Sequence, residues 1–156
     1  MELKISILGL LALLTLDSAS SQDMPSAKKS APIIGKLFID PCSTVISGGK
    51  ANLRIGALSR QAQAYIGDYQ FKVSPYFFKN EKGKLSIEVA DDTLDKLANG
   101  MEVDFTGQAT TSGSGKTRRI DGKATPAGNA RGTVKLWFIA GTKEMVVTTS
   151  YHFDEK

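Results

Sequence analysis

Alternation of apolar and polar residues runs through most of this chain and limits it to a fold built from extended strands. Successive side chains of a strand point to opposite faces, so each alternating run predicts a strand with one buried and one solvated face. The longest such run is Met145 to Phe153. Other runs cover Ala51–Ala57, Tyr65–Val73, Leu85–Val89, Met101–Phe105 and Val134–Phe138.

Turn-forming residues separate these runs and set the fold class. Seven or eight short strands with turns about every 8 to 12 residues predict an all-β fold, either an antiparallel β-sandwich or a small β-barrel. The stretch "ADDTLDKLANG" breaks the alternation. It predicts one short helix at about residues 91–99, capped by Asp91 or Asp92 and ended by Asn99 and Gly100.

Individual residues add local expectations. Pro75 cannot donate a ladder hydrogen bond, so its strand should lie at an edge or bulge there. Asn80 and Gly83 supply turn chemistry for a hairpin, and Gly67 suits a strongly bent sheet. Trp137 and Ile139 share the second face of their strand, which predicts a central strand covered on both sides.

The amino-terminal residues are typical of an export signal. Lys4 precedes a largely apolar run from Ile5 to Leu16, and small residues follow it. We expect a cleaved signal peptide over residues 1–21, a flexible leader over 22–35 and one β-rich domain over 36–156. The mature protein would be secreted or periplasmic. Its single cysteine, Cys42, allows no internal disulfide and is expected to be buried rather than reactive.

The stretch "TTSGSGKTRRIDGK" contains the last three letters of a phosphate-binding loop. Such a loop needs an earlier glycine where this chain has Thr110, and a helix that starts at the lysine. Gly122, Pro126 and Gly128 follow the lysine, and glycine and proline both disfavour a helix there. The stretch therefore predicts a hairpin loop between strands that end near Thr110 and begin near Arg118, and no nucleotide is expected.

The same region is strongly basic, with six Lys or Arg residues against Asp121 between Gly113 and Lys135. Removal of residues 1–21 raises the formal net charge of the protein from +4 to about +5, so this segment accounts for the whole excess. It predicts a basic edge that attracts an anionic lipid, polysaccharide or protein surface. The alternative is an edge strand kept unpaired by its charges. The candidate binding residues are Lys116, Arg118, Arg119, Lys123 and Arg131.

Two other functions stay open. The succession of strands resembles exported β-sandwich and lipocalin-like barrel groups, and such a barrel would hold an apolar small ligand. An open cavity lined by Tyr69, Phe71, Leu136 and Phe138 would favour this alternative, and a largely filled interior would dismiss it. A carboxylate-based hydrolase is the third function, and it would need Glu88 and Asp104 to converge in one cleft.

The remaining constellations predict little chemistry. One histidine, His152, and one cysteine lie far apart in the chain, so no metal site, cofactor or catalytic triad is expected. His152 is expected to be exposed near the end of the last strand. The basic segment has no interleaved aromatic residues, so nucleic acid is not an expected partner. In "PYFF", Pro75 to Phe78, at least one aromatic ring must face away from the core if the segment is extended. The leading prediction is a non-enzymatic exported binding or structural domain of the cell envelope.

Overall fold

The computed structural model describes residues 35–128, 130–140 and 142–154. The predicted signal peptide and all of the predicted leader except Gly35 lie outside these residues. Export and cleavage therefore stay predictions. No helix in the described part of the chain combines the length and the apolar character needed to cross a bilayer.

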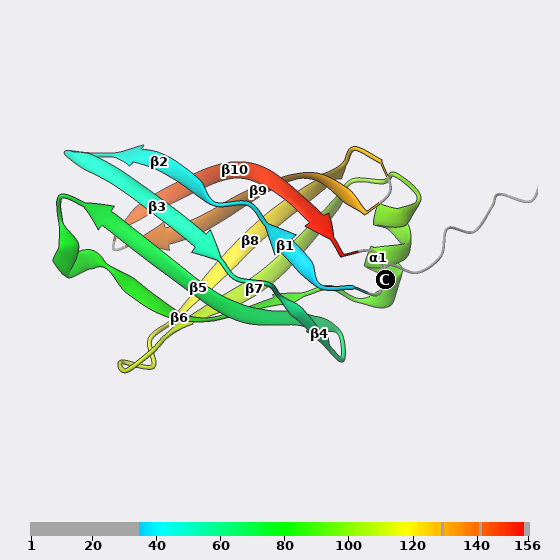
Figure 1. The fold of residues 1–156 in the computed structure, drawn as a ribbon, viewed down its shortest axis with the longest axis horizontal. Helices are drawn as coiled ribbons and strands as arrows, with labels where there is room; N and C mark the ends of the chain where they lie inside the picture. The colour runs from blue at the N-terminus through cyan, green and yellow to red at the C-terminus, as the bar shows by residue number, and fades with distance from the viewer. Residues whose placement is uncertain (1–34, 129, 141, 155–156) are drawn as a thin grey trace, which may run out of the picture.

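The fold is all-β with one short α-helix, as the alternation predicted. Ten strands form one curled antiparallel sheet in the order β1-β10-β9-β8-β7-β6-β5-β3-β2, with β4 paired to β5 (Figure 1). The strands are β1 (Leu37–Ile39), β2 (Cys42–Ile46), β3 (Gly49–Ile55), β4 (Ser59–Gln61), β5 (Ala64–Ser74), β6 (Glu81–Glu88), β7 (Val103–Thr111), β8 (Thr117–Pro126), β9 (Arg131–Ala140) and β10 (Lys143–Phe153). A 3-10 helix η1 (Phe77–Lys79) and the helix α1 (Asp91–Ala98) complete the described elements.

The two end strands of the sheet, β1 and β2, are consecutive in the chain. β1 pairs with the last three residues of β10, and after Asp40 and Pro41 the chain pairs with β3 instead. The sheet therefore curls into an incomplete barrel. Ten strands appear instead of seven or eight because the first runs are interrupted, at Asp40–Pro41 and again between Ile55 and Ser59.

The buried face of each strand is the one that the alternation marks as apolar. Leu85 and Ile87 of β6 and Leu136 of β9 are almost completely buried, and no polar or charged residue of the described chain falls in the buried class. One hydrophobic cluster joins residues from β1, β3, β5 to β10 and α1. The interior is therefore a single continuous core.

Gly67 of β5 permits a close approach of the chain segment between β3 and β4. Leu58, fully buried between β3 and β4, bonds through its backbone to Leu37 and lies against Gly67. A Cβ atom at Gly67 would stand 2.7 Å from Leu58 Cδ2 and 2.9 Å from the Ala57 carbonyl oxygen. Glycine is needed here because a side chain would have no space.

The helix α1 closes one end of the barrel. Leu94 and Leu97 are buried, and the helix contacts β7 and β8. Its end is as predicted, because Asn99 is the carboxyl-terminal cap and Gly100 has a φ of 76°. The predicted amino-terminal cap was wrong: Ala90 holds that position, and no side chain caps the helix. Asp91 and Asp92 instead lie in the first turn, where carboxylates favour the positive end of the helix dipole.

Three local expectations need correction. Pro75 follows β5 and does not interrupt it, and β5 is a central strand between β3 and β6. Gly83 lies inside β6, paired with Tyr69, and only Asn80 belongs to the connection. β9 is central in the sheet, but its second face is not covered: Ile139 is exposed and Trp137 is half-buried. A curled sheet buries only its inner face. The central position of β9 in the sheet therefore did not mean that its outer face is covered.

The glycine-rich stretch is a hairpin turn, as predicted. β7 ends at Thr111 and β8 begins at Thr117, and the Gly113 and Gly115 φ angles of 88° and 66° make the turn. A strand, not a helix, follows Lys116. The second requirement of a phosphate-binding loop is therefore absent.

Candidate functional site

An open groove of about 970 Å³ lies at the end of the sheet opposite α1. Its volume is at the upper end of the range of about 300–1,000 Å³ typical of small-molecule sites. Apolar side chains make up much of its wall: Phe71, Val73, Tyr76, Phe78, Met145 and Val146. Charged residues line it as well: Lys79, Glu81, Arg118, Lys143 and Glu144. We refer to this space as the mouth groove.

The groove exists because the barrel is not closed at this end. β10 is paired with β1 only from Tyr151 to Phe153, and in the described part of the chain no ladder joins β2 to β10. Residues 44–47 line one side of the groove and residues 143–146 line the other. The two strands diverge from the junction at Asp40, whose amide bonds to the Ser150 carbonyl. The change of partner at Asp40–Pro41 therefore produces the opening.

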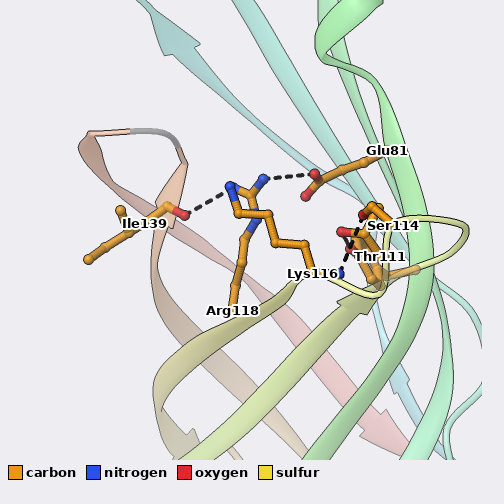
Figure 2. Close-up of polar contacts among 7 residues, drawn as sticks. Glu81, Thr111, Ser114, Lys116, Arg118 and Ile139 are labelled. Atoms are coloured by element: carbon orange, nitrogen blue, oxygen red, sulfur yellow. Dashed lines mark hydrogen bonds and ion pairs between the residues drawn. The ribbon is translucent and has the colours of Figure 1, made fainter.

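Arg118 and Glu81 form the floor of the mouth groove. The guanidinium donates to Glu81 Oε2 at 2.8 Å and to the Ile139 carbonyl at 3.1 Å (Figure 2). Both side chains are less than one fifth exposed. Arg118 is on the inner face of β8, the face of the buried Ile120, which directs its long side chain into the barrel. Its buried Nε has no hydrogen-bond partner among the described residues.

A small apolar cavity lies beneath this floor. Its volume is about 40 Å³, and its lining includes the four residues proposed from the sequence: Tyr69, Phe71, Leu136 and Phe138. Arg118, Glu81 and Phe71 line both this cavity and the mouth groove. A second cavity of about 30 Å³ lies toward α1. Neither has room for a ligand of ordinary size, since a cavity of about 150 Å³ is needed to hold benzene.

The five residues predicted as a basic edge are not gathered on an edge. β8 is a central strand between β7 and β9, so the word edge was wrong for this segment. Lys116 is in the β7–β8 turn and Arg118 is at the groove floor. Arg119 and Lys123 lie on the outer face of β8, while Arg131 begins β9 near α1. The structure brings only Lys116 and Arg118 to the mouth end.

Acidic neighbours neutralise most of these cations. Arg119 lies 2.7 Å from Asp121, and Lys123 lies 2.9 Å from Glu102 and 3.7 Å from Asp104. Hydrogen bonds from Thr125 and then Lys123 lower the pKa of Glu102. The bond to Asp121 raises the pKa of Arg119, and the bond to Glu102 raises the pKa of Lys123. The outer face of β8 is therefore a network of paired charges.

Exposed aromatic rings lie beside the mouth groove. Phe77 and Phe78 are 73% and 81% exposed, so two rings of "PYFF" face away from the core. The segment is not extended, because both rings belong to the 3-10 helix η1. Tyr76 is partly buried and packs edge-to-face with Phe78. The Lys79 ammonium stands 5.1 Å from the Tyr76 ring centroid and 5.9 Å from that of Phe78.

The remaining predicted constellations show no assembled chemistry. Glu88 accepts a hydrogen bond from Thr106 and lines a shallow depression that Asp104 does not line. No group of three or more potential metal ligands occurs within the described ranges. His152 is exposed, as expected, and stacks on Phe38 at 5.0 Å between ring centroids. Cys42 is half-buried, and desolvation raises the pKa of its thiol.

Sequence reasoning missed the mouth groove itself and the role of Glu81. The groove depends on where β2 and β10 separate, which no short stretch of sequence reveals. Glu81 was read only as part of a turn. The available signal was charge at inward-facing positions. Glu81 in β6 and Arg118 in β8 both lie on the strand face that otherwise carries apolar residues.

Comparison with protein-family models, with curated proteins and with solved structures finds no match. The site is therefore interpreted from its own residues.

Proposed function

We propose that this protein is a non-enzymatic binding domain that holds a small amphipathic anion, such as a long-chain carboxylate, in the mouth groove. The observation that carries the proposal is the position of Arg118. It is a cation at the floor of an open groove, with apolar walls around it and an apolar cavity beneath it. An anionic head and an apolar chain would each find a complementary surface there.

The charged groups at the floor favour an anion over a neutral ligand. Glu81 and the Ile139 carbonyl hold two guanidinium nitrogens, and the third, Nε, is buried without a partner. Nε itself is shielded from the groove, so an anion would meet the guanidinium through its two outer nitrogens. Lys79 and Lys143 line the same groove against Glu144, so the lining charges outside the Arg118–Glu81 pair leave an excess of one positive charge.

The apolar part of the ligand would lie against the groove walls and not deep in the barrel. Phe71, Val73 and Met145 line the groove on its inner side. The cavity beneath Arg118, at about 40 Å³, is too small for more than a methyl-sized group. A lipocalin-like ligand buried in the interior would require Arg118 and Glu81 to separate. The sequence-based predictions gave an anionic partner and, as an alternative, an apolar ligand. An amphipathic anion in the groove would combine both properties in one molecule.

The test is a fluorescence titration with dansylated undecanoic acid, whose emission rises and shifts to the blue in an apolar site. Saturable binding is expected, and Arg118→Met should weaken it by about tenfold or more, because hydrogen bonds to charged groups contribute about 1.5–3 kcal/mol. Arg119→Met is the matched control, since Arg119 is on the outer face and paired with Asp121. It should bind like the parent protein.

Two further measurements separate loss of the site from loss of the fold. Arg118→Met leaves Glu81 without its partner, so the double variant Glu81→Gln, Arg118→Met removes the pair together. The double variant should fold, and it should bind the dansylated acid more weakly than the parent protein does. The dansylated alcohol of the same chain length should bind the parent poorly and should not distinguish the variants. Equal binding of acid and alcohol, or no effect of Arg118→Met, would contradict the proposal.

A further inference from the structure

Exposed apolar side chains gather at the mouth end of the molecule. Among the described residues, six large hydrophobic side chains are exposed, and five of them lie at this end. We call these five the mouth rim: Val45, Phe77, Phe78, Ile139 and Val146. The sixth, Met101, follows α1 at the opposite end. A concentration of exposed apolar side chains marks an interaction surface, whereas single ones do not.

The rim comes from three separate connections. Val45 belongs to the end of β2, the two phenylalanines to η1, and Ile139 and Val146 to the β9–β10 hairpin. Val45, Phe78 and Val146 also line the mouth groove, but Phe77 does not. A substitution of Phe77 therefore changes the outer surface without changing the lining of the groove.

Lysines are interspersed with the rim. The connections at this end carry Lys50, Lys79, Lys116 and Lys143, against one acidic residue, Glu144, apart from the paired Arg118 and Glu81. The segment from Ala90 to Glu102 at the other end has the opposite sign, with Asp91, Asp92, Asp95 and Glu102 against Lys96. Arg60 pairs with Asp91 and Lys123 pairs with Glu102, and Lys36 and Arg131 lie toward that end as well. The charges of the α1 end are therefore mixed, whereas the apolar rim carries an excess of lysines.

We propose that the mouth rim docks on the surface of an anionic lipid bilayer. Aromatic and aliphatic side chains enter the boundary between headgroups and acyl chains, and nearby lysines bind lipid phosphates. The excess of lysines at the rim favours an orientation in which the rim faces such a surface. Lysine is depleted at protein–protein interfaces, so a rim with interspersed lysines favours lipid over a protein partner.

This contact goes beyond the proposed ligand and does not require that the groove be occupied. Bilayer docking would place the open groove at the membrane surface, where amphipathic anions are held. The two ideas fail separately, because Phe77, Lys50 and Lys116 do not line the groove and Arg118 is not part of the rim.

The test is sedimentation of the protein with vesicles of phosphatidylcholine alone and with added phosphatidylglycerol. Binding is expected only with the anionic vesicles and should fall as salt is raised, since salt screens exposed charges. Phe77→Ser should weaken binding by about tenfold, the value of removing one buried aromatic side chain. Lys50→Glu together with Lys116→Glu should weaken it by at least as much. Every variant carries the same amino-terminal segment, so differences between variants report on the rim.

Matched substitutions at the opposite end provide the controls. Met101→Ser removes an exposed apolar side chain near α1, and Lys36→Glu reverses an exposed charge before β1. Both variants should bind vesicles like the parent. Equal binding to neutral vesicles, or an unchanged affinity for Phe77→Ser, would overturn the proposal. So would a change of oligomeric state in Phe77→Ser without vesicles, because the rim would then be covered by a second copy of the chain.

Discussion

At the residue scale, two tyrosines on the same face of β5 differ in how their hydroxyl groups are satisfied. The Tyr65 hydroxyl is buried without a hydrogen-bond partner among the described residues, and burial raises its pKa, although the nearby Arg60 opposes that shift. The Tyr69 hydroxyl shares a hydrogen bond of 3.2 Å with Thr111. An unsatisfied buried hydroxyl costs about 1–3 kcal/mol, so the two positions should respond differently to phenylalanine.

Tyr65→Phe should therefore leave the free energy of unfolding unchanged or raise it by up to ~1 kcal/mol. Tyr69→Phe is the control and should lower it by ~0.5–1.5 kcal/mol, because a satisfied bond is lost. Urea unfolding followed by circular dichroism measures both. A greater loss for Tyr65→Phe than for Tyr69→Phe would show that the Tyr65 hydroxyl has a partner after all.

At the element scale, the close packing of β5 against the chain between β3 and β4 depends on the contact of Gly67 with Leu58. Gly67→Ala would force its Cβ atom against Leu58 and the Ala57 carbonyl, and overpacking of this kind costs about 1–3 kcal/mol of stability. Gly56→Ala is the matched control, since its Cβ would meet nothing nearer than the Asp68 carbonyl oxygen at 3.4 Å. Chemical denaturation should find Gly56→Ala close to the parent. Equal stability of the two variants would refute the steric account of Gly67.

Elements were predictable from the sequence where one local signal decided them. Alternation identified the buried faces of β5 and β10, and Asn99–Gly100 fixed the end of α1. Position within the sheet was not predictable in the same way. The strand β8 was expected at an edge because it is basic, yet it is central. Arg119 and Lys123 point outward, where Arg119 pairs with Asp121 of the same strand and Lys123 pairs with Glu102 and Asp104. Charge shows which face is solvated and does not show which strands are neighbours.

At the scale of the whole molecule, one sheet and one core should give one cooperative unfolding transition. Trp137, half-buried on β9, reports on the middle of the sheet, and far-ultraviolet circular dichroism reports on all strands. Both signals should change at the same urea concentration, as expected when no intermediate is populated. Two separated transitions would show that the mouth end and the α1 end fold independently.

The candidate site was only partly predictable, because it arises at this same scale. Sequence reasoning selected Arg118 and the four apolar residues around the inner cavity, but it did not place them at one mouth. That arrangement depends on long-range pairing: residues from β2, β6, β8 and β10 meet only after the sheet has curled. The ion pair of Glu81 with Arg118 forms only when folding brings β6 and β8 close together.

The change of partner at Asp40–Pro41 also determines which part of the sheet is most open to local unfolding. Backbone amides of β2 that face β10 lack a ladder partner in the described structure, whereas β1 remains bonded on the same flank. Local opening should begin along that seam and leave the α1 end shut, because regions with few hydrogen bonds open at the lowest cost. Opening of this seam would separate β2 from β10 while the single hydrophobic core stays packed.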